Sequence, residues 1–262
     1  MNQQNLISAI VVFDIDGVVR DVSGSYRRAL ADTVEKFTAQ AYRPTADEID
    51  QLKSEGLWNN DWEGSQELIY RYFETQEKSR EEIDINYNSI VAFFQSRYRG
   101  TDSNNFTGYI RDEPLLLQRS YLNQLSETGI RWGFFSGATR GSANYVLQQR
   151  LGLESPILIA MEDAPGKPDP TGLFSTLELL QYEEDSSSVI YVGDTVADMY
   201  TVEKARTIQP NRTWIGVGVL PPHVQKTPQK RDAYVESLKK AGAKIVLSNV
   251  QDLTPEKIQE LI

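Results

Sequence analysis

The chain has 262 residues, no cysteine, a single histidine and a net charge of −10. The lack of cysteine excludes disulfides, thiol nucleophiles and thiolate metal sites, and one histidine argues against a histidine-rich metal centre or a serine–histidine–aspartate triad. The excess of 37 acidic over 27 basic residues argues against nucleic acid as the main partner. A hydrophobic content of 40% is typical of a globular protein with one large domain or two smaller ones.

The N-terminal segment lacks the basic residues of a secretory signal, and its apolar run stops at Asp14, which is too short to cross a bilayer. We therefore expect a cytoplasmic protein with no membrane association. We expect it to be a monomer or a homodimer, and the sequence does not separate the two.

The first predicted element is a buried strand, because Ile10 to Phe13 is an apolar run without alternation. Two carboxylates one residue apart, Asp14 and Asp16, follow it and precede Gly17. On a continuing strand the two acids would lie on the same side, where they would repel each other unless a cation or a shared proton separated them. An acidic turn is the alternative reading, since Asp and Gly are ordinary turn residues.

Residues 20–109 are predicted to be mainly helical and contain no strong strand pattern. Apolar residues recur at helical spacing from Tyr26 to Phe37, and further helices are expected over 47–52, 66–75 and 88–98. We interpret this part of the chain as a separate helical subdomain inserted after the first strand.

Residues 110–262 alternate between predicted strands and helices, as in βαβ units of a parallel sheet. The strands are expected over 130–135, 157–161, 189–192, 213–219 and 244–247. The helices between and after them are expected over 114–127, 142–151, 173–180, 196–206, 229–241 and 255–261. Together with residues 1–19, this region predicts an α/β domain.

Polar residues follow four of the predicted strands, and ligands of open α/β sheets bind at the carboxyl ends of strands. Taken one at a time, each has an ordinary structural explanation as a helix cap, a turn or exposed surface. Four in this order are hard to obtain by accident. They are Asp14 with Asp16, Ser136, Lys167, and Asp194 with Asp198.

These four motifs resemble those of the haloacid dehalogenase-like hydrolases, and the resemblance covers nearly the whole chain. The motifs are Asp14-Ile15-Asp16-Gly17, Phe135-Ser136-Gly137, Gly166-Lys167-Pro168 and Gly193-Asp194-Thr195-Val196-Ala197-Asp198. A helical insert between the first two motifs is similar to the type 1 cap of subfamily IA. The resemblance implies a Rossmann-like doubly wound parallel sheet, formed by residues 1–19 and 110–262, with a helical cap at 20–109.

The resemblance also implies a role for each catalytic residue. Asp14 would attack phosphorus and form an aspartyl-phosphate, and Asp16 would act as the general acid and then as the general base. Lys167 would neutralise charge between Asp14 and the phosphate, while Ser136 and Gly137 would bind phosphoryl oxygens.

A magnesium site is implied as well, because Mg²⁺ takes oxygen ligands and needs few carboxylates. Its ligands would be Asp14, the backbone carbonyl of Asp16, Asp194 and Asp198, although the sequence leaves open whether Asp198 binds the ion directly. The function implied is an Mg²⁺-dependent phosphatase acting on a small phosphorylated metabolite. A phosphomutase of the same fold, or a binding protein that keeps the fold without catalysis, are the alternatives.

The expected cap contains a segment suited to choosing the leaving group. Asn59, Asn60 and Asp61 offer clustered hydrogen-bonding groups between Trp58 and Trp62. We predict that these three polar residues bind substrate in a loop before the helix at 66–75. The alternative is that the two tryptophans only pack the core of the cap.

Overall fold

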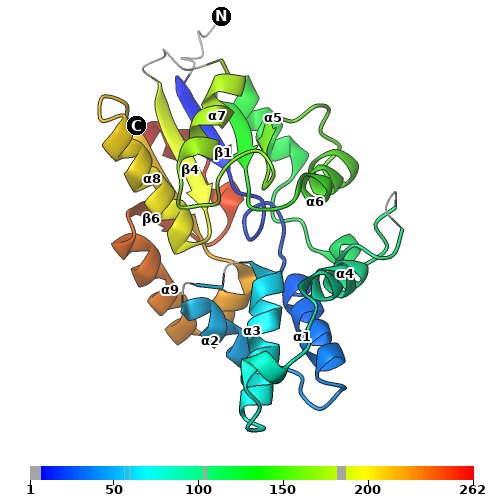
Figure 1. The fold of residues 1–262 in the computed structure, drawn as a ribbon. Helices are drawn as coiled ribbons and strands as arrows, with labels where there is room; N and C mark the ends of the chain where they lie inside the picture. The colour runs from blue at the N-terminus through cyan, green and yellow to red at the C-terminus, as the bar shows by residue number, and fades with distance from the viewer. Residues whose placement is uncertain (1–6, 56, 59, 103–104, 182–186) are drawn as a thin grey trace, which may run out of the picture. The chain divides into compact units, whose positions relative to one another are not determined.

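A computed structural model describes residues 7–55, 57–58, 60–102, 105–181 and 187–262. The chain divides into two compact units, one made of Met1–Asp21 with Pro114–Ile262 and the other of Val22–Glu113 (Figure 1). The second unit spans residues 22–113, whereas the sequence pattern predicted an insert over residues 20–109. Among the described residues, none of the helices has both the length and the apolar character needed to span a bilayer.

The first unit contains a six-stranded sheet in which every neighbouring pair is parallel, in the order β3-β2-β1-β4-β5-β6. Its strands are β1 (Ala9–Phe13), β2 (Arg131–Phe135), β3 (Leu158–Ile159), β4 (Ser188–Gly193), β5 (Trp214–Val219) and β6 (Ala243–Leu247). This arrangement confirms the predicted parallel sheet. The strand order turns at β1, which pairs with β2 on one side and β4 on the other. Ligand sites of such sheets lie at this reversal.

Helices cover both faces of the sheet, which confirms the doubly wound architecture. They are α5 (Arg119–Glu127), α6 (Arg140–Asn144), the π-helical turn η3 (Tyr145–Arg150), α7 (Thr171–Leu179), α8 (Val196–Ile208), η4 (Pro222–Lys226), α9 (Pro228–Lys240), η5 (Val250–Asp252) and α10 (Pro255–Leu261). Alternate residues of β1 point to opposite cores: Val11 and Phe13 pack with α5, η3 and α10, while Ile10 and Val12 pack with α7 and α8. Burial on both faces explains the continuous apolar run of this strand.

Two predicted elements of this unit differ from those observed. The helix expected over 114–127 begins only at Arg119. The preceding segment is not helical, because its backbone bonds to another part of the chain: Asp21 donates a backbone hydrogen bond to Pro114, and Leu116 donates one to Val19. The strand that carries Asp14 ends at Phe13, and the chain turns before Asp16 instead of continuing as a strand.

The second unit is helical, as expected. Its elements are α1 (Tyr26–Phe37), α2 (Ala46–Ser54), α3 (Asp61–Glu74), η1 (Arg80–Glu82), α4 (Tyr87–Tyr98) and η2 (Tyr109–Asp112). Helices α1, α3 and α4 pack together, with the ring of Tyr26 stacked on that of Tyr98 at 4.2 Å between centroids. Helix α3 starts five residues before the predicted position, at Asp61 and not at residue 66.

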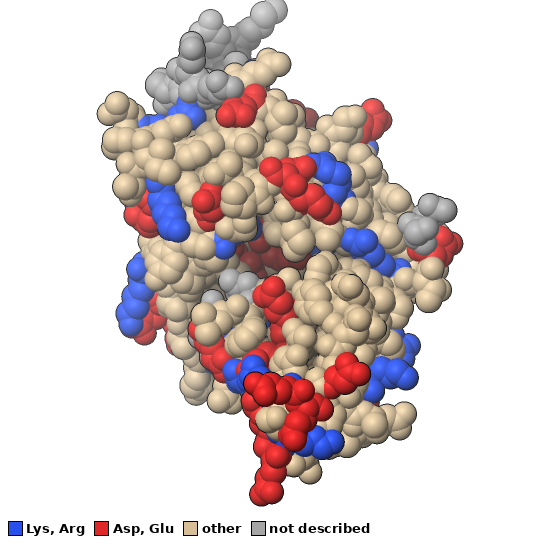
Figure 2. Space-filling view, viewed as in Figure 1, with Lys and Arg blue, Asp and Glu red and all other residues tan. Residues whose placement is uncertain are grey.

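Acidic side chains gather over the end of α3 and the segment that follows it (Figure 2). The exposed acids there are Glu74, Glu77, Glu81, Glu82 and Asp84. Acids outnumber the exposed Lys78 and Arg80 on this surface, and an excess of negative charge does not favour a phosphate backbone.

Candidate active site

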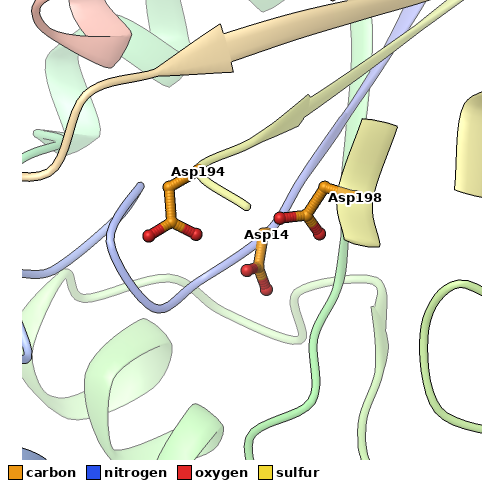
Figure 3. A group of neighbouring side chains, drawn as sticks. All are labelled: Asp14, Asp194 and Asp198. Atoms are coloured by element: carbon orange, nitrogen blue, oxygen red, sulfur yellow. The ribbon is translucent and has the colours of Figure 1, made fainter. Parts of the chain in front are cut away.

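Three carboxylates meet at the carboxyl ends of the two central strands (Figure 3). Asp14 directly follows β1, Asp194 directly follows β4, and Asp198 lies in the first turn of α8. Strands β1 and β4 are neighbours with Phe13 paired to Val192, so their ends deliver the acids to one place. One oxygen from each carboxylate lies within 4.8 Å of the others.

Burial and the neighbouring negative charges raise the pKa values of two of these acids, Asp14 and Asp194. Burial raises the pKa of Asp14 to about 6, with further upward contributions from the charges of Asp198 and Asp16 and an opposing one from Lys167. Burial, followed by the charges of Asp198 and Asp14, also raises the pKa of Asp194 well above its ordinary value. A site that crowds negative charge in this way is suited to a cation, which would relieve the repulsion. Three clustered carboxylate oxygens are the hard ligands that Mg²⁺ prefers.

Lys167 lies between two of these acids. Its Nζ is 2.9 Å from Oδ1 of Asp14 and 2.7 Å from Oδ1 of Asp198. Burial by itself would lower the pKa of this ammonium, but the charges of Asp14 and Asp198 outweigh it and hold the pKa well above its ordinary value. The rings of Phe135 and Tyr191 lie 5.3 and 5.4 Å from the nitrogen, a distance at which both can stabilise a cation. The lysine is therefore a fixed positive charge.

Asp198 is saturated by hydrogen bonds. Its Oδ2 accepts from the backbone N–H and the hydroxyl of Thr195, which completes a capping box at the start of α8. Its Oδ1 faces Lys167 and lies 3.2 Å from the hydroxyl of Tyr191. The side chain is fully buried. These contacts favour Asp198 as the partner that positions Lys167 and leave Asp14 and Asp194 as the better placed metal ligands.

Asp16 is held by an arginine that the sequence motif does not contain. Nε of Arg20 donates to Oδ1 of Asp16 at 2.7 Å. Gly17 between them has φ +77°, and a Cβ at this position would lie 2.0 Å from Oδ2 of Asp194. The glycine is required both by the backbone conformation and by the approach of Asp194.

Ser136 and Gly137 follow β2, on the other side of β1. Ser136 is buried, and its Oγ accepts a hydrogen bond of 3.1 Å from the backbone N–H of Ala138. Gly137 is exposed, and a Cβ built on it would meet no atom within 4 Å. The loop thus offers a serine hydroxyl and exposed backbone at the end of the strand next to Asp14, and its binding of phosphoryl oxygens stays a prediction.

The polar residues proposed for substrate binding have structural partners in the helical unit. Asn60 is the N-cap of α3 and its side chain accepts a hydrogen bond of 2.9 Å from the N–H of Trp62. Asp61 forms an ion pair of 2.7 Å with Lys53. Asn59 lies outside the described residues. The capping role of Asn60 explains why α3 begins before residue 66, and substrate binding by Asn60 and Asp61 stays a prediction.

A model of the family described as haloacid dehalogenase-like hydrolase matches residues 9–206. The chain belongs to this family. The match spans all four of the sequence motifs, from Asp14 to Asp198, and confirms the resemblance drawn from them. Membership places the chain among enzymes of the hydrolase type.

The chain is similar to an imidazoleglycerol-phosphate dehydratase from Phytophthora nicotianae, with 28% identity over 258 residues. The aligned region is 94% of this chain and 52% of the other protein, so the chain spans about half the length of that relative.

Solved structures of the haloacid dehalogenase-like family have the same fold. A phosphonoacetaldehyde hydrolase-like protein from Oleispira antarctica superimposes with a TM-score of 0.65 and 17% identity, over 97% of this chain and 92% of that one. A β-phosphoglucomutase from Clostridium difficile superimposes with a TM-score of 0.56 and 19% identity, over 97% and 96% of the two chains. At these identities the likeness concerns the fold alone.

Two residues of this family member were not found by sequence reasoning. The sequence pattern assigns no role to Arg20, whose burial and contact with Asp16 exist only in the folded chain. Tyr191 has a sequence signal, because it is a residue with a hydroxyl among buried aliphatic ones in its strand. Its hydroxyl lies 3.1 Å from the backbone carbonyl of Phe135, in addition to its contact with Asp198.

Proposed function

We propose that the chain is an Mg²⁺-dependent phosphatase that hydrolyses a small phosphorylated metabolite through an aspartyl-phosphate on Asp14. The observation that carries this proposal is the position of Lys167 between Asp14 and Asp198, with Asp194 beside them. A carboxylate nucleophile next to a fixed ammonium and a cluster of further acids is an arrangement for phosphoryl transfer, in which charge neutralisation and positioning supply most of the catalysis.

The magnesium ion would be held by Asp14 and Asp194, with the backbone carbonyl of Asp16. Asp198 would position Lys167 through their ion pair. When bound, the ion would neutralise phosphoryl charge and so permit an anionic nucleophile to approach an anionic substrate. One carboxylate oxygen of Asp14 and one of Asp194 lie within 4.8 Å of each other, which suits a single ion.

The reaction proceeds in two displacements at phosphorus. In the first, an oxygen of Asp14 forms a bond to phosphorus while the bond to the leaving oxygen breaks, and Asp16 gives its proton to that oxygen. In the second, Asp16 takes a proton from water, the water oxygen bonds to phosphorus, and the Asp14–phosphorus bond breaks. Lys167 offsets the phosphoryl charge in both displacements, and Ser136 and Gly137 bind the phosphoryl oxygens.

The helical unit acts in this proposal as a cap that selects the leaving group, because the strand-end residues deal only with phosphoryl transfer. The substrate is a small phosphate monoester. The name of the Phytophthora nicotianae relative contains an imidazole-bearing polyol phosphate, so esters of that chemistry belong among the compounds tested.

Phosphate release from a panel of phosphorylated metabolites and from 4-nitrophenyl phosphate tests the proposal, in Mg²⁺ and in EDTA. We expect release that depends on Mg²⁺ and is lost in Asp14→Asn. A phosphomutase would interconvert sugar phosphate isomers with little release, and a binding protein would bind a phosphate ester without turnover. Either result would overturn hydrolysis as the function.

A further inference from the structure

Arg20 is completely buried and its guanidinium reaches one oxygen of Asp16 with two nitrogens. Nε donates to Oδ1 at 2.7 Å, and Nη2 lies 2.6 Å from the same atom. A buried arginine is rare unless a partner balances its charge. The contact with Asp16 is therefore part of the structure of the site and not an incidental surface ion pair.

Backbone hydrogen bonds fix the position of the main chain that carries the Arg20 side chain. Gly17 donates a hydrogen bond of 2.9 Å to the carbonyl of Arg20, and Arg20 donates one of 3.2 Å to Ile15. Arg20 also pairs as an isolated antiparallel bridge with Leu115. The loop that bears Asp16 is therefore closed on itself and tied to a second segment, which leaves the guanidinium little freedom to move away.

The contact with Arg20 gives the two carboxylate oxygens of Asp16 different surroundings. Oδ1 is occupied by the arginine, whereas Oδ2 accepts no hydrogen bond from the described part of the chain. The side chain is 27% exposed, so this second oxygen can meet a substrate or water. Because two cationic nitrogens already face Oδ1, Oδ2 is the oxygen left to contact a leaving group or a water.

We propose that Arg20 is a positioning residue for proton transfer, which holds Asp16 through Oδ1 so that Oδ2 alone exchanges the proton. The proposal rests on the function proposed above. In the first displacement the Oδ2–H bond breaks and an O–H bond forms on the leaving oxygen. In the second, a water O–H bond breaks and the Oδ2–H bond forms again, so Asp16 ends as it began.

The role predicts a dependence on the leaving group. An alkoxide is a poor leaving group and needs its proton during bond cleavage, whereas 4-nitrophenolate departs with little help. Misplacing Oδ2 should therefore slow the hydrolysis of alkyl phosphates much more than that of 4-nitrophenyl phosphate. A residue that only supports the fold would affect both esters by the same factor.

The experiment compares wild type, Arg20→Met and Arg20→Lys in the full chain, with 4-nitrophenyl phosphate, phenyl phosphate and the best alkyl phosphate of the metabolite panel. For Arg20→Met we expect kcat/KM on the alkyl ester, which reports the displacement that releases the leaving group, to fall by about tenfold to a hundredfold, within the range of general acid catalysis. The fall on 4-nitrophenyl phosphate should be less than about threefold. Arg20→Lys keeps the buried charge and should recover part of the loss, and it replaces Arg20→Met if that variant does not fold.

Two controls separate positioning from stability. In an Asp16→Asn background, Arg20→Met should add no further dependence on the leaving group, because the proton carrier is already gone. Leu238→Ala, on the buried face of α9, should lower stability without changing the ratio of the rates on the two esters.

Equal losses of kcat/KM on all esters, or a further change in the Asp16→Asn background, would overturn the role of Arg20 and leave the phosphatase proposal intact. A wild type that releases no phosphate from any ester in Mg²⁺ would instead overturn the phosphatase proposal, and with it the role of Arg20 in that reaction.

Discussion

Lys167 and Asp198 form a buried ion pair, with 2.7 Å between Nζ and Oδ1. The other oxygen of Asp198 caps α8, and no part of the side chain reaches solvent. Asp194 is half-buried and directly follows β4, with its pKa raised mainly by burial. The two acids of the Gly-Asp motif thus differ in their surroundings. Asp198 is paired with a lysine and caps a helix, whereas Asp194 is repelled by neighbouring carboxylates, a repulsion that a cation would relieve.

We expect Asp194→Ala to weaken Mg²⁺ binding and Asp198→Asn to leave it nearly unchanged. The first change removes a proposed ligand, which should raise the Mg²⁺ midpoint by about tenfold or more. The second releases Lys167 and should lower kcat by about a hundredfold, the effect of losing one electrostatic group. The midpoint can be read from the Mg²⁺-dependent rise in Tm, which needs no turnover.

Lys167→Ala is the matched control, because it removes charge from the phosphoryl pocket without removing a proposed ligand. Its Mg²⁺ midpoint should stay near that of the wild type. If Asp198→Asn shifts the midpoint as far as Asp194→Ala does, Asp198 is itself a ligand and the division of roles is wrong.

Asp14→Asn should abolish turnover and also change how stability depends on pH. The pKa of Asp14 in the folded protein is about 6, above the ordinary value of 3.8. A raised pKa contributes stability that is fully present below about pH 4 and is lost as the pH rises through about 6. Each pKa unit is worth about 1.4 kcal/mol, so ionised Asp14 costs the metal-free protein at most about 3 kcal/mol.

The amide of the Asn variant stays neutral, so metal-free Asp14→Asn should be more stable than wild type at pH 8 and equal to it near pH 4. Urea unfolding in EDTA at the two pH values measures this. A wild type that is the more stable protein at pH 8 would contradict the assignment of the raised pKa to Asp14.

The positions of the acids at the strand ends could be predicted from the sequence, because they depend on local pattern. The apolar run before Asp14, and the Gly-Asp motif after Val192, place acids at the ends of parallel strands whatever surrounds them. The partners of those acids depend on packing between distant segments. Lys167 and Asp198 are 31 residues apart in the chain and meet only when β3 and β4 take their places in the sheet.

The start of α5 shows a second limit of local pattern. Residues 114–118 could continue the helix by composition, but their backbone groups bond to residues 19–21, an interaction that no local window reveals. Arg20 was missed for the same reason, since burial and an ion pair distinguish it from an exposed arginine only in the folded chain.

Gly17→Ala should disable the site while a matched glycine change should not. At φ +77° an alanine is strained by about 1 to 3 kcal/mol, and its Cβ would displace the carboxylate of Asp194. We expect lower stability together with a higher Mg²⁺ midpoint. Gly24→Ala serves as the control, because a Cβ there meets nothing within 4 Å.

Thermal unfolding with and without Mg²⁺ compares the two glycine variants. If Gly17→Ala loses stability but binds Mg²⁺ as the wild type does, Asp194 tolerates the new methyl group and the close approach does not matter for the metal.

The polar segment before α3 gives the prediction that bears on substrate choice. Asn60 caps the helix, so Asn60→Ala should cost about 1 kcal/mol of stability whatever the substrate. Asp61 is the better candidate for a substrate contact, because it is partly exposed and its ion pair with Lys53 places a carboxylate and an ammonium together. A site built to hydrogen-bond a hydroxyl discriminates strongly, since its polar groups are left unpaired by the wrong substrate.

We expect Asp61→Ala to lower kcat/KM for the true substrate by about tenfold or more, the scale of one lost hydrogen bond to a charged group. The same variant should change kcat/KM for 4-nitrophenyl phosphate much less, because that ester has no hydroxyl for the segment to bind. Asn60→Ala, compared at equal folded fraction, separates the loss of the helix cap from the loss of a substrate contact. If Asp61→Ala reduces activity on both esters equally, Asp61 serves the fold of the helical unit through Lys53, and the choice of leaving group has to be sought in other residues of that unit.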